Sequence, residues 1–257
     1  MNEVIPATYD TSLVVLSFVV AFIGSYIALS ASQKLRGNQG RSYNYHLMIA
    51  GIALGGIGVW AMHFIGMLAM RMPLGMSYSM IETVVSLVAA VAATAWGLSI
   101  VARNPKSLRH LLAAGAMLGT GVGVMHYLGM YGMRFGGFFQ WDFGLVALSI
   151  VIAWVAATAA LWLAFNTPSH WMRVVAAVVM AAAVCSMHYT GMLAADIVCT
   201  TTERMAMPSG FGLLNVLELP MLVITLVVGM TLAIGVNLMF APITPIPRRP
   251  ANQRPTA

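Results

Sequence analysis

Three copies of one short pattern divide the chain into repeats. The stretches read AMHFIGM at 61–67, VMHYLGM at 124–130 and SMHYTGM at 186–192. They place His63, His126 and His188 at steps of 63 and 62 residues. A unit of this length that occurs three times predicts a repeat architecture, in which each copy folds in the same way and packs against the next.

The composition places these repeats in a membrane. The 257 residues are 60% hydrophobic and 8% charged, and the mean hydropathy is +0.86, whereas soluble domains carry about 25% charged residues. The first ten residues contain Glu3 and Asp10 but no basic residue, so the first apolar segment is expected to be a retained helix and not a signal peptide. A bilayer takes about 20 residues, and the segments long enough to cross it cover 11–32, 46–70, 79–102, 110–133, 142–165, 172–194 and 212–240.

The basic residues predict the orientation of these seven segments. Ten fall on one side, namely Lys34, Arg36, Arg41, Arg103, Lys106, Arg109, Arg173, Arg248, Arg249 and Arg254. Three fall on the other, namely Arg71, Arg134 and Arg204. Cytoplasmic loops are rich in Lys and Arg, so we expect a multi-pass protein of a bacterial inner membrane with its N-terminus outside and its C-terminus inside. The net charge of +6 follows from these loops and requires no nucleic acid.

The predicted fold is an all-α integral membrane protein with seven transmembrane helices, made of a threefold repeated helix pair and a seventh helix. Residues 1–10 are expected to be a periplasmic N-terminus, 10–205 the six repeat helices, and 212–240 the seventh helix. Residues 241–257 contain five of the eleven prolines, which predicts a disordered cytoplasmic tail without an output domain. The loops contain no nucleophile–base pair, phosphate loop or acid pair, so we expect no enzyme.

The three motif histidines are expected at one depth in the membrane. Eight residues separate His63 from Arg71, which places His63 about 12 Å along the helix from the outer surface. A lone histidine in a membrane helix is usually a packing residue. Three at one level are costly unless they face inward and meet partners. Glycine recurs three residues after each histidine, and small residues let helices approach closely, so the histidines should meet inside a compact bundle.

Methionines accompany the histidines at helical spacing. Those one turn after each histidine, on the same face, are Met67, Met130 and Met192. Those just before each histidine are Met62, Met125 and Met187, which point about 100° away and so either flank the site or only pack. Imidazole suits copper, zinc and iron, whereas thioether suits soft ions and Cu(I) above all. The pattern favours copper with an open position for O₂, CO or NO. Haem, which also takes His and Met as axial ligands, is the alternative.

The motifs resemble the MHYT family of bacterial membrane sensors, whose tetrapeptide stands complete at 187–190. The resemblance covers residues 10–205 and implies a copper site near the outer face that senses a diatomic gas or redox state. Family members often continue into cytoplasmic domains that make or break cyclic dinucleotides. The residues implied in binding are Met62, His63, Met125, His126, Tyr127, Met187, His188 and Tyr189. Phe64 stands where the first tyrosine belongs, so the chain offers two motif tyrosines instead of three.

Two further functions compete with a copper sensor that signals through a cytoplasmic partner. One is a haem-binding electron-transfer protein, and the other is a transporter of copper or protons. The transporter would use Glu218, which is expected six residues into the seventh helix at about the depth of the histidines. Glu218, Tyr127 and Tyr189 are candidates for hydrogen bonds that support the metal ligands. Cys185 is expected to pack and not to form a disulfide with Cys199.

Overall fold

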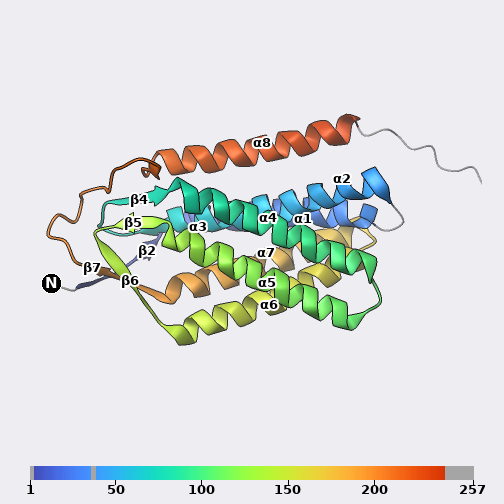
Figure 1. Cartoon of the computed structure of the whole chain (residues 1–257), viewed down its shortest axis with the longest axis horizontal. Helices are drawn as coiled ribbons and strands as arrows, with labels where there is room; N and C mark the ends of the chain where they lie inside the picture. Colours follow the sequence, from blue (N-terminus) through green and yellow to red (C-terminus); the bar gives the residue numbers. More distant parts are fainter. Residues whose placement is uncertain (1–2, 36–38, 241–257) are drawn as a thin grey trace, which may run out of the picture.

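The computed structural model describes residues 3–35 and 39–240, so the predicted tail at 241–257 lies outside the described residues. In this part of the chain the long helices run side by side along one axis (Figure 1). They are α1 (Thr11–Ser32, extended by the 3₁₀ turn η1, Gln33–Leu35), the continuous rod α2–η2–α3 (Gly40–Gly51, Ile52–Ala61, Met62–Ala69), α4 (Met80–Arg103), α5 (Leu108–Tyr131), α6 (Phe143–Asn166), α7 (His170–Leu193) and α8 (Glu218–Phe240).

Six helices in the described residues are long and apolar enough to cross a membrane, and they are the six predicted for the repeats. The predicted first motif helix at 46–70 begins earlier in the structure, at Gly40. The seventh segment at 212–240 does form a helix, but this helix begins at Glu218, because Leu213–Leu214 pairs as a strand and Asn215 precedes the helix as a cap. Whether α8 also spans a membrane stays a prediction.

Capping residues set where the repeat helices begin. The side chains of Asp10 and Asp142 each accept two backbone N–H groups at the starts of α1 and α6. Ser107 and Ser169 do the same with one N–H each at the starts of α5 and α7. These bonds satisfy donors that a helix start leaves without partners. Between their ends the helices expose apolar side chains, such as Val19 and Val155, as expected of surfaces that face lipid.

Short antiparallel strands, which the sequence pattern did not predict, gather at one end of the bundle (Figure 1). Each repeat pairs the strand before its first helix with the strand after its motif helix, as β2–β3, β4–β5 and β6–β7. Two to five residues are too few for a period-2 pattern to be recognised. The strands are β1 (Glu3–Ile5), β2 (Thr8–Tyr9), β3 (Met70–Arg71), β4 (Met76–Ser79), β5 (Met133–Phe135), β6 (Gly137–Trp141), β7 (Ala195–Cys199) and β8 (Leu213–Leu214), in sheets β1-β7-β6, β2-β3 and β5-β4-β8.

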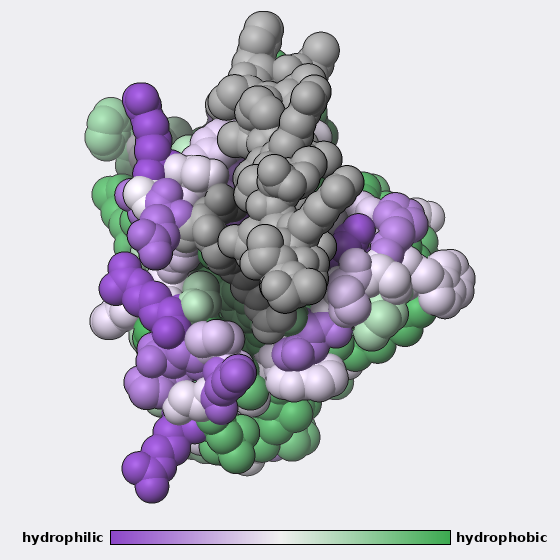
Figure 2. Space-filling model, turned by 90° about the vertical axis from the view of Figure 1, so that its right-hand side faces the viewer, coloured by the Kyte–Doolittle hydropathy of each residue, from purple (hydrophilic) through white to green (hydrophobic). Residues whose placement is uncertain are grey.

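The two ends of the bundle differ in charge. At the strand end, which holds β1 to β8, all three arginines form ion pairs: Arg71 with Asp10 at 3.0 Å, Arg134 with Glu82 at 2.6 Å, and Arg204 with Glu3. The opposite end, which we call the loop end, holds the turns at 104–107 and 167–169. Hydrophilic residues gather there (Figure 2). The two predicted groups of basic residues therefore lie at opposite ends among the described residues, while the side of the membrane that each end faces stays a prediction.

Candidate metal centre

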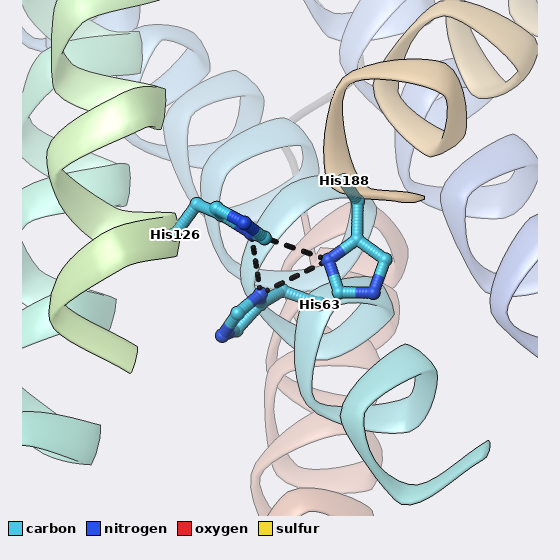
Figure 3. A group of neighbouring side chains, drawn as sticks. All are labelled: His63, His126 and His188. Carbon is cyan, nitrogen blue, oxygen red and sulfur yellow. Dashed lines mark hydrogen bonds between the residues drawn. The ribbon is translucent and has the colours of Figure 1, made fainter. Parts of the chain in front are cut away.

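The three motif helices bring His63, His126 and His188 together on the axis of the bundle (Figure 3). His63 comes from α3, His126 from α5 and His188 from α7, and each side chain is at most 1% exposed. The Nδ1 atoms lie 3.1 Å apart for His63 and His126, 3.2 Å for His63 and His188, and 3.3 Å for His126 and His188. The predicted meeting of the three histidines inside the bundle is confirmed.

The rings are oriented so that the three Nδ1 atoms point at one centre. The ring centroids are 4.9–5.1 Å apart, which is much farther than the Nδ1 atoms, and the ring planes stand at 77–89° to one another. The middle of a triangle of Nδ1 atoms with these sides is about 1.9 Å from each nitrogen, and zinc–imidazole bonds are about 2.0–2.1 Å. His63, His126 and His188 would therefore be able to hold a metal ion together through their Nδ1 atoms.

Hydrogen bonds among the three histidines cannot satisfy all three Nδ1 atoms. Each Nδ1 holds either a proton or a lone pair in the plane of its ring, so three nitrogens directed at one point compete for the same space. Two N–H groups there would collide. At least two lone pairs therefore face each other, which is repulsive unless a cation lies between them. The buried three-histidine group could hold a metal ion.

The motif glycines make room for the far side of each ring. The Nε2 atoms of the three histidines are buried and have no hydrogen-bond partner in the described structure. A Cβ added at Gly66 would lie 2.2 Å from Nε2 of His188. The same atom at Gly129 would lie 2.3 Å from Nε2 of His63, and at Gly191 2.3 Å from Nε2 of His126. Each motif therefore supplies a histidine and also the glycine that accommodates a histidine from another helix.

The six predicted methionines are all buried, but their surroundings differ. Met67, Met130 and Met192 lie one helical turn from the histidines toward the strand end, within the main core. Met62 packs with Ala21 of α1 and Ala181 of α7. Met125 belongs to the main core, and Met187 lines a partly open cavity. These placements separate the two predicted sets: the later methionines share one layer, whereas the earlier ones occupy three different environments.

The motif tyrosines direct their hydroxyls away from the triad and toward serines. The rings of Tyr127 and Tyr189 contact the histidine before them edge-on, with centroids 4.8 Å apart. The hydroxyl of Tyr127 bonds Ser149 at 2.6 Å, and that of Tyr189 bonds Ser17 at 3.0 Å. Sequence reasoning missed these serines, although they occupy the same place in LSFVVAF at Leu16 and LSIVIAW at Leu148.

The first motif helix also bonds a serine of a neighbouring helix, Ser86 of α4, but uses a different residue. Ser86 occupies the same place in VSLVAAV, but Phe64 has no hydroxyl to offer it. The indole Nε1 of Trp60 bonds Ser86 Oγ at 3.1 Å and the carbonyl oxygen of Thr83 at 3.0 Å. Ser17, Ser86 and Ser149 are all fully buried. A hydrogen bond from a motif helix therefore reaches each buried serine, and in the first repeat a different residue provides it.

Glu218 lies elsewhere than the sequence pattern suggested. It is exposed at the first turn of α8, where its Oε2 accepts the N–H of Asn215 at 2.9 Å and Asn215 Oδ1 accepts the N–H of Glu218 at 3.0 Å. This reciprocal pair resembles a capping box. The predicted position six residues into the helix at histidine depth is therefore wrong, because the helix begins later than predicted. Cys185 and Cys199 are both free, as expected.

These features define a helical protein of the multi-pass membrane class with a buried three-histidine group. The model of the MHYT family, a bacterial signalling protein N-terminal repeat, matches residues 56–114 and 119–177, which include the first two motifs. The chain belongs to the MHYT family. No solved structure matches it.

Several curated proteins are similar to the chain. They include the bifunctional diguanylate cyclase/cyclic di-GMP phosphodiesterase MucR of Pseudomonas aeruginosa, 36% identical over 195 residues. The signaling protein YkoW of Bacillus subtilis is 33% identical over 198 residues, and the cyclic di-GMP phosphodiesterase NbdA of P. aeruginosa is 36% identical over 193 residues. The similarity covers 73–74% of this chain and 24–28% of these relatives, so the chain matches about a quarter of their length.

Proposed function

We propose that the chain is a membrane sensor module whose three histidines bind copper and respond to a diatomic gas or to redox state. The observation that carries this proposal is the triangle of buried Nδ1 atoms, all directed at one point. A sensing role is in keeping with the relatives, whose names describe signalling and cyclic di-GMP enzymes. The proposed module itself is not an enzyme, and its signal passes to a cytoplasmic partner activity.

Copper fits the donors present. His63, His126 and His188 would hold the ion through Nδ1. Copper would supply a change of oxidation state and an affinity for small diatomic ligands. The layer of Met67, Met130 and Met192 adds thioethers one turn away, and thioethers favour Cu(I) over the harder divalent ions. The chain's own contribution is a buried pocket in which each imidazole packs against a glycine.

The geometry disfavours both alternatives. A porphyrin clamped by two axial imidazoles needs its whole ring between them, and histidine nitrogens 3.1–3.3 Å apart leave no room for it. A transport path would need polar groups on the loop-end side of the triad. The residues four positions before the histidines are Val59, Val122 and Val184, which form an apolar layer there. Glu218, capped at the exposed start of α8, is not part of such a path.

In the proposed arrangement the strand end faces the periplasm, and the loop end faces the cytoplasm of a bacterial inner membrane. The arginines at the strand end are neutralised by ion pairs, whereas the loop end carries most of the basic residues. This distribution follows the positive-inside rule. Labelling of single cysteines should reach position 136 from outside and position 104 only from inside. Outside labelling at 104 would reverse the orientation.

The metal proposal is tested by elemental analysis of purified protein. The His126→Ala variant should lose bound copper, since removal of one of three imidazoles opens the site. His63→Ala and His188→Ala should do the same. The matched control is His110→Ala, because His110 is exposed at the loop end and bonds only the nearby Ser107 among the described residues. Equal copper content in all four variants would show that the triad only packs.

The role of the thioethers is tested by replacing Met67, Met130 and Met192 together with leucine, which has nearly the same volume and should preserve the fold. If the sulfurs bind, the triple variant should lose its preference for Cu(I) but keep Cu(II) or Zn(II). If the Cu(I) affinity changes by less than about threefold, under 1 kcal/mol, the site consists of the histidines alone. Competition with a chelator of known Cu(I) affinity measures the difference.

A further inference from the structure

A partly open cavity, lined mostly by buried side chains, lies on the loop-end side of the histidine triad. Its volume, counted as the space open to the centre of a water-sized sphere, is about 30 Å³. Val59, Val122 and Val184 line it, and each stands four residues, one helical turn, before a motif histidine. Every repeat therefore contributes one valine to the lining of the cavity. Ala153, Ala156, Ala157 and Ala160 of α6 form one wall.

The chemistry of the lining suits a small apolar occupant and not water. The lining side chains are leucine, valine, alanine and methionine, with Thr94 as the one hydroxyl among them. The Oγ1 of Thr94 already donates to the carbonyl oxygen of Ala90 at 2.7 Å. A buried water needs two to four polar partners, and one water needs about 10–15 Å³ of such space. The cavity thus has the volume for about two water-sized particles and offers an occupant almost no hydrogen bonds.

We propose that this cavity is the docking site for an apolar diatomic molecule on its way to the metal. The inference rests on the proposed function, because the metal is the destination of the ligand. The cavity and the triad share the same three helices, and Met187, the residue before His188, lines the cavity. A molecule such as O₂, CO or NO gains from leaving water for this lining without losing hydrogen bonds.

Xenon binding to the metal-free protein tests the cavity by itself. Xenon is a small apolar probe that enters dry cavities, and its resonance reports occupancy. Ala157→Leu places a larger side chain in the cavity, and the milder Ala157→Val does so with less strain should the first variant fail to fold. The control is Ala159→Leu, which adds the same volume at an exposed position of α6 that lines a separate, open groove and not this cavity.

Wild type and Ala159→Leu should bind xenon, and both Ala157 variants should bind it at least about tenfold more weakly because the space is filled. Absence of xenon binding in wild type would overturn the proposal. Equal binding in all variants would overturn it as well.

The rate at which CO rebinds to the copper-loaded protein after flash photolysis tests the route to the metal. The Ala157 variants should slow CO association by about tenfold relative to Ala159→Leu, since filling the cavity removes the docking step. Equal CO rates together with loss of xenon binding would overturn the route while the metal site stands. Failure of wild type to bind copper would overturn the proposed function, and the xenon result would still decide the cavity.

Discussion

The first motif helix and the other two carry the same histidine in different surroundings. In the rod Gly40–Ala69, 83% of the apolar segment is buried, compared with 39% in α5 and 44% in α7. Helix α8 accounts for part of this difference, because it packs on η2 and α3 and no such helix covers α5 or α7 in the described residues. Met230 of α8 lies where a side chain on Gly56 would stand. One repeat is enclosed by protein, while two remain open to lipid.

The winding of the helices differs in the same way. The stretch Ile52–Ala61 is π-helical, with wider turns, whereas α5 and α7 are regular α-helices. The cavity-lining residues of α5, Leu118 and Val122, precede His126 by eight and four positions. In the first helix Leu54 and Val59 precede His63 by nine and four. The wider turns of the π-helical stretch accommodate one extra residue, so that Leu54 and Val59 line the cavity as Leu118 and Val122 do. His63 therefore joins the triad although its helix is wound differently from α5 and α7.

The largest expected effect is the loss of the metal centre on adding one methyl group to a motif glycine. Gly66→Ala, Gly129→Ala and Gly191→Ala should each lower copper affinity by about 10–100-fold, because the new Cβ displaces the histidine ring of another helix. Gly229→Ala, where a Cβ meets nothing within 4 Å, is the control. Isothermal titration with copper measures the change. Retention of copper by Gly66→Ala, with loss in the other two variants, would show that the contact of Gly66 with the ring of His188 does not support the site.

The next effect should separate the first repeat from the others. Trp60→Ala removes a fully buried indole and its two hydrogen bonds, and should lower the free energy of unfolding by about 3–5 kcal/mol. Trp96→Ala, on the exposed face of α4, should have a far smaller effect. Unfolding in a denaturing detergent series measures both. Equal losses of unfolding free energy in the two variants would show that burial and hydrogen bonding of Trp60 do not stabilise the protein.

Replacing Phe64 by the tyrosine found in the other two motifs should destabilise the protein. Phe64→Tyr adds a hydroxyl to a fully buried ring whose matching serine, Ser86, is already bonded to Trp60. An unsatisfied buried hydroxyl costs about 1–3 kcal/mol, so the free energy of unfolding should fall by this amount. A gain in stability in the same assay would show that Ser86 readily exchanges partners and that the two kinds of repeat are interchangeable.

A smaller loss is expected from the reverse change in the other repeats. Tyr127→Phe and Tyr189→Phe each remove one hydrogen bond to a serine, and should lower the free energy of unfolding by about 0.5–1.5 kcal/mol. The serines stay bonded to the carbonyl oxygens of Val146 and Val14, so no polar group is orphaned. Copper content should not change. Loss of copper would assign the tyrosine hydroxyls a direct part in metal binding.

The smallest effect concerns pH at the strand end. The hydrogen bond from Arg71, followed by that from the Leu13 N–H, holds the pKa of Asp10 below its usual value. A carboxylate with a lowered folded pKa adds stability above its unfolded pKa of about 3.9, and this stability is lost as the pH falls through the folded value. Asp10→Asn should therefore be less stable than wild type at neutral pH, and the gap should close in acid.

Asp142→Asn is the control for this last prediction, since Asp142 caps α6 but forms no ion pair among the described residues. Unfolding at neutral and acidic pH measures both differences. If wild type and Asp10→Asn differ in free energy of unfolding by the same amount at both pH values, the ion pair with Arg71 is not the cause of the difference.

The helices and the meeting of the histidines could be predicted from the amino-acid sequence. Length and hydropathy are local properties, so the six repeat helices could be located to within a few residues, apart from the early start at Gly40. Three copies of one motif at nearly equal spacing are expected to fold alike, so His63, His126 and His188 were predicted to share one depth. A polar histidine in an apolar interior is unfavourable without a partner, so the three histidines were expected to contact one another. None of these steps needed to know how the helices are rotated against one another.

The partners of individual side chains depend on how the helices pack and could not be predicted from the sequence. A motif shows that Gly66 and His63 lie on one helix, but the packing of three helices places Gly66 against His188. The serine partners of Tyr127 and Tyr189 depend in the same way on the neighbouring helices, and so does the use of Trp60 where Phe64 has no hydroxyl. Hydropathy placed the start of α8 too early, because pairing of Leu213–Leu214 with β4 takes these residues out of the helix. Rotation, register and cross-chain pairing arise from packing between distant segments, and a local pattern does not encode them.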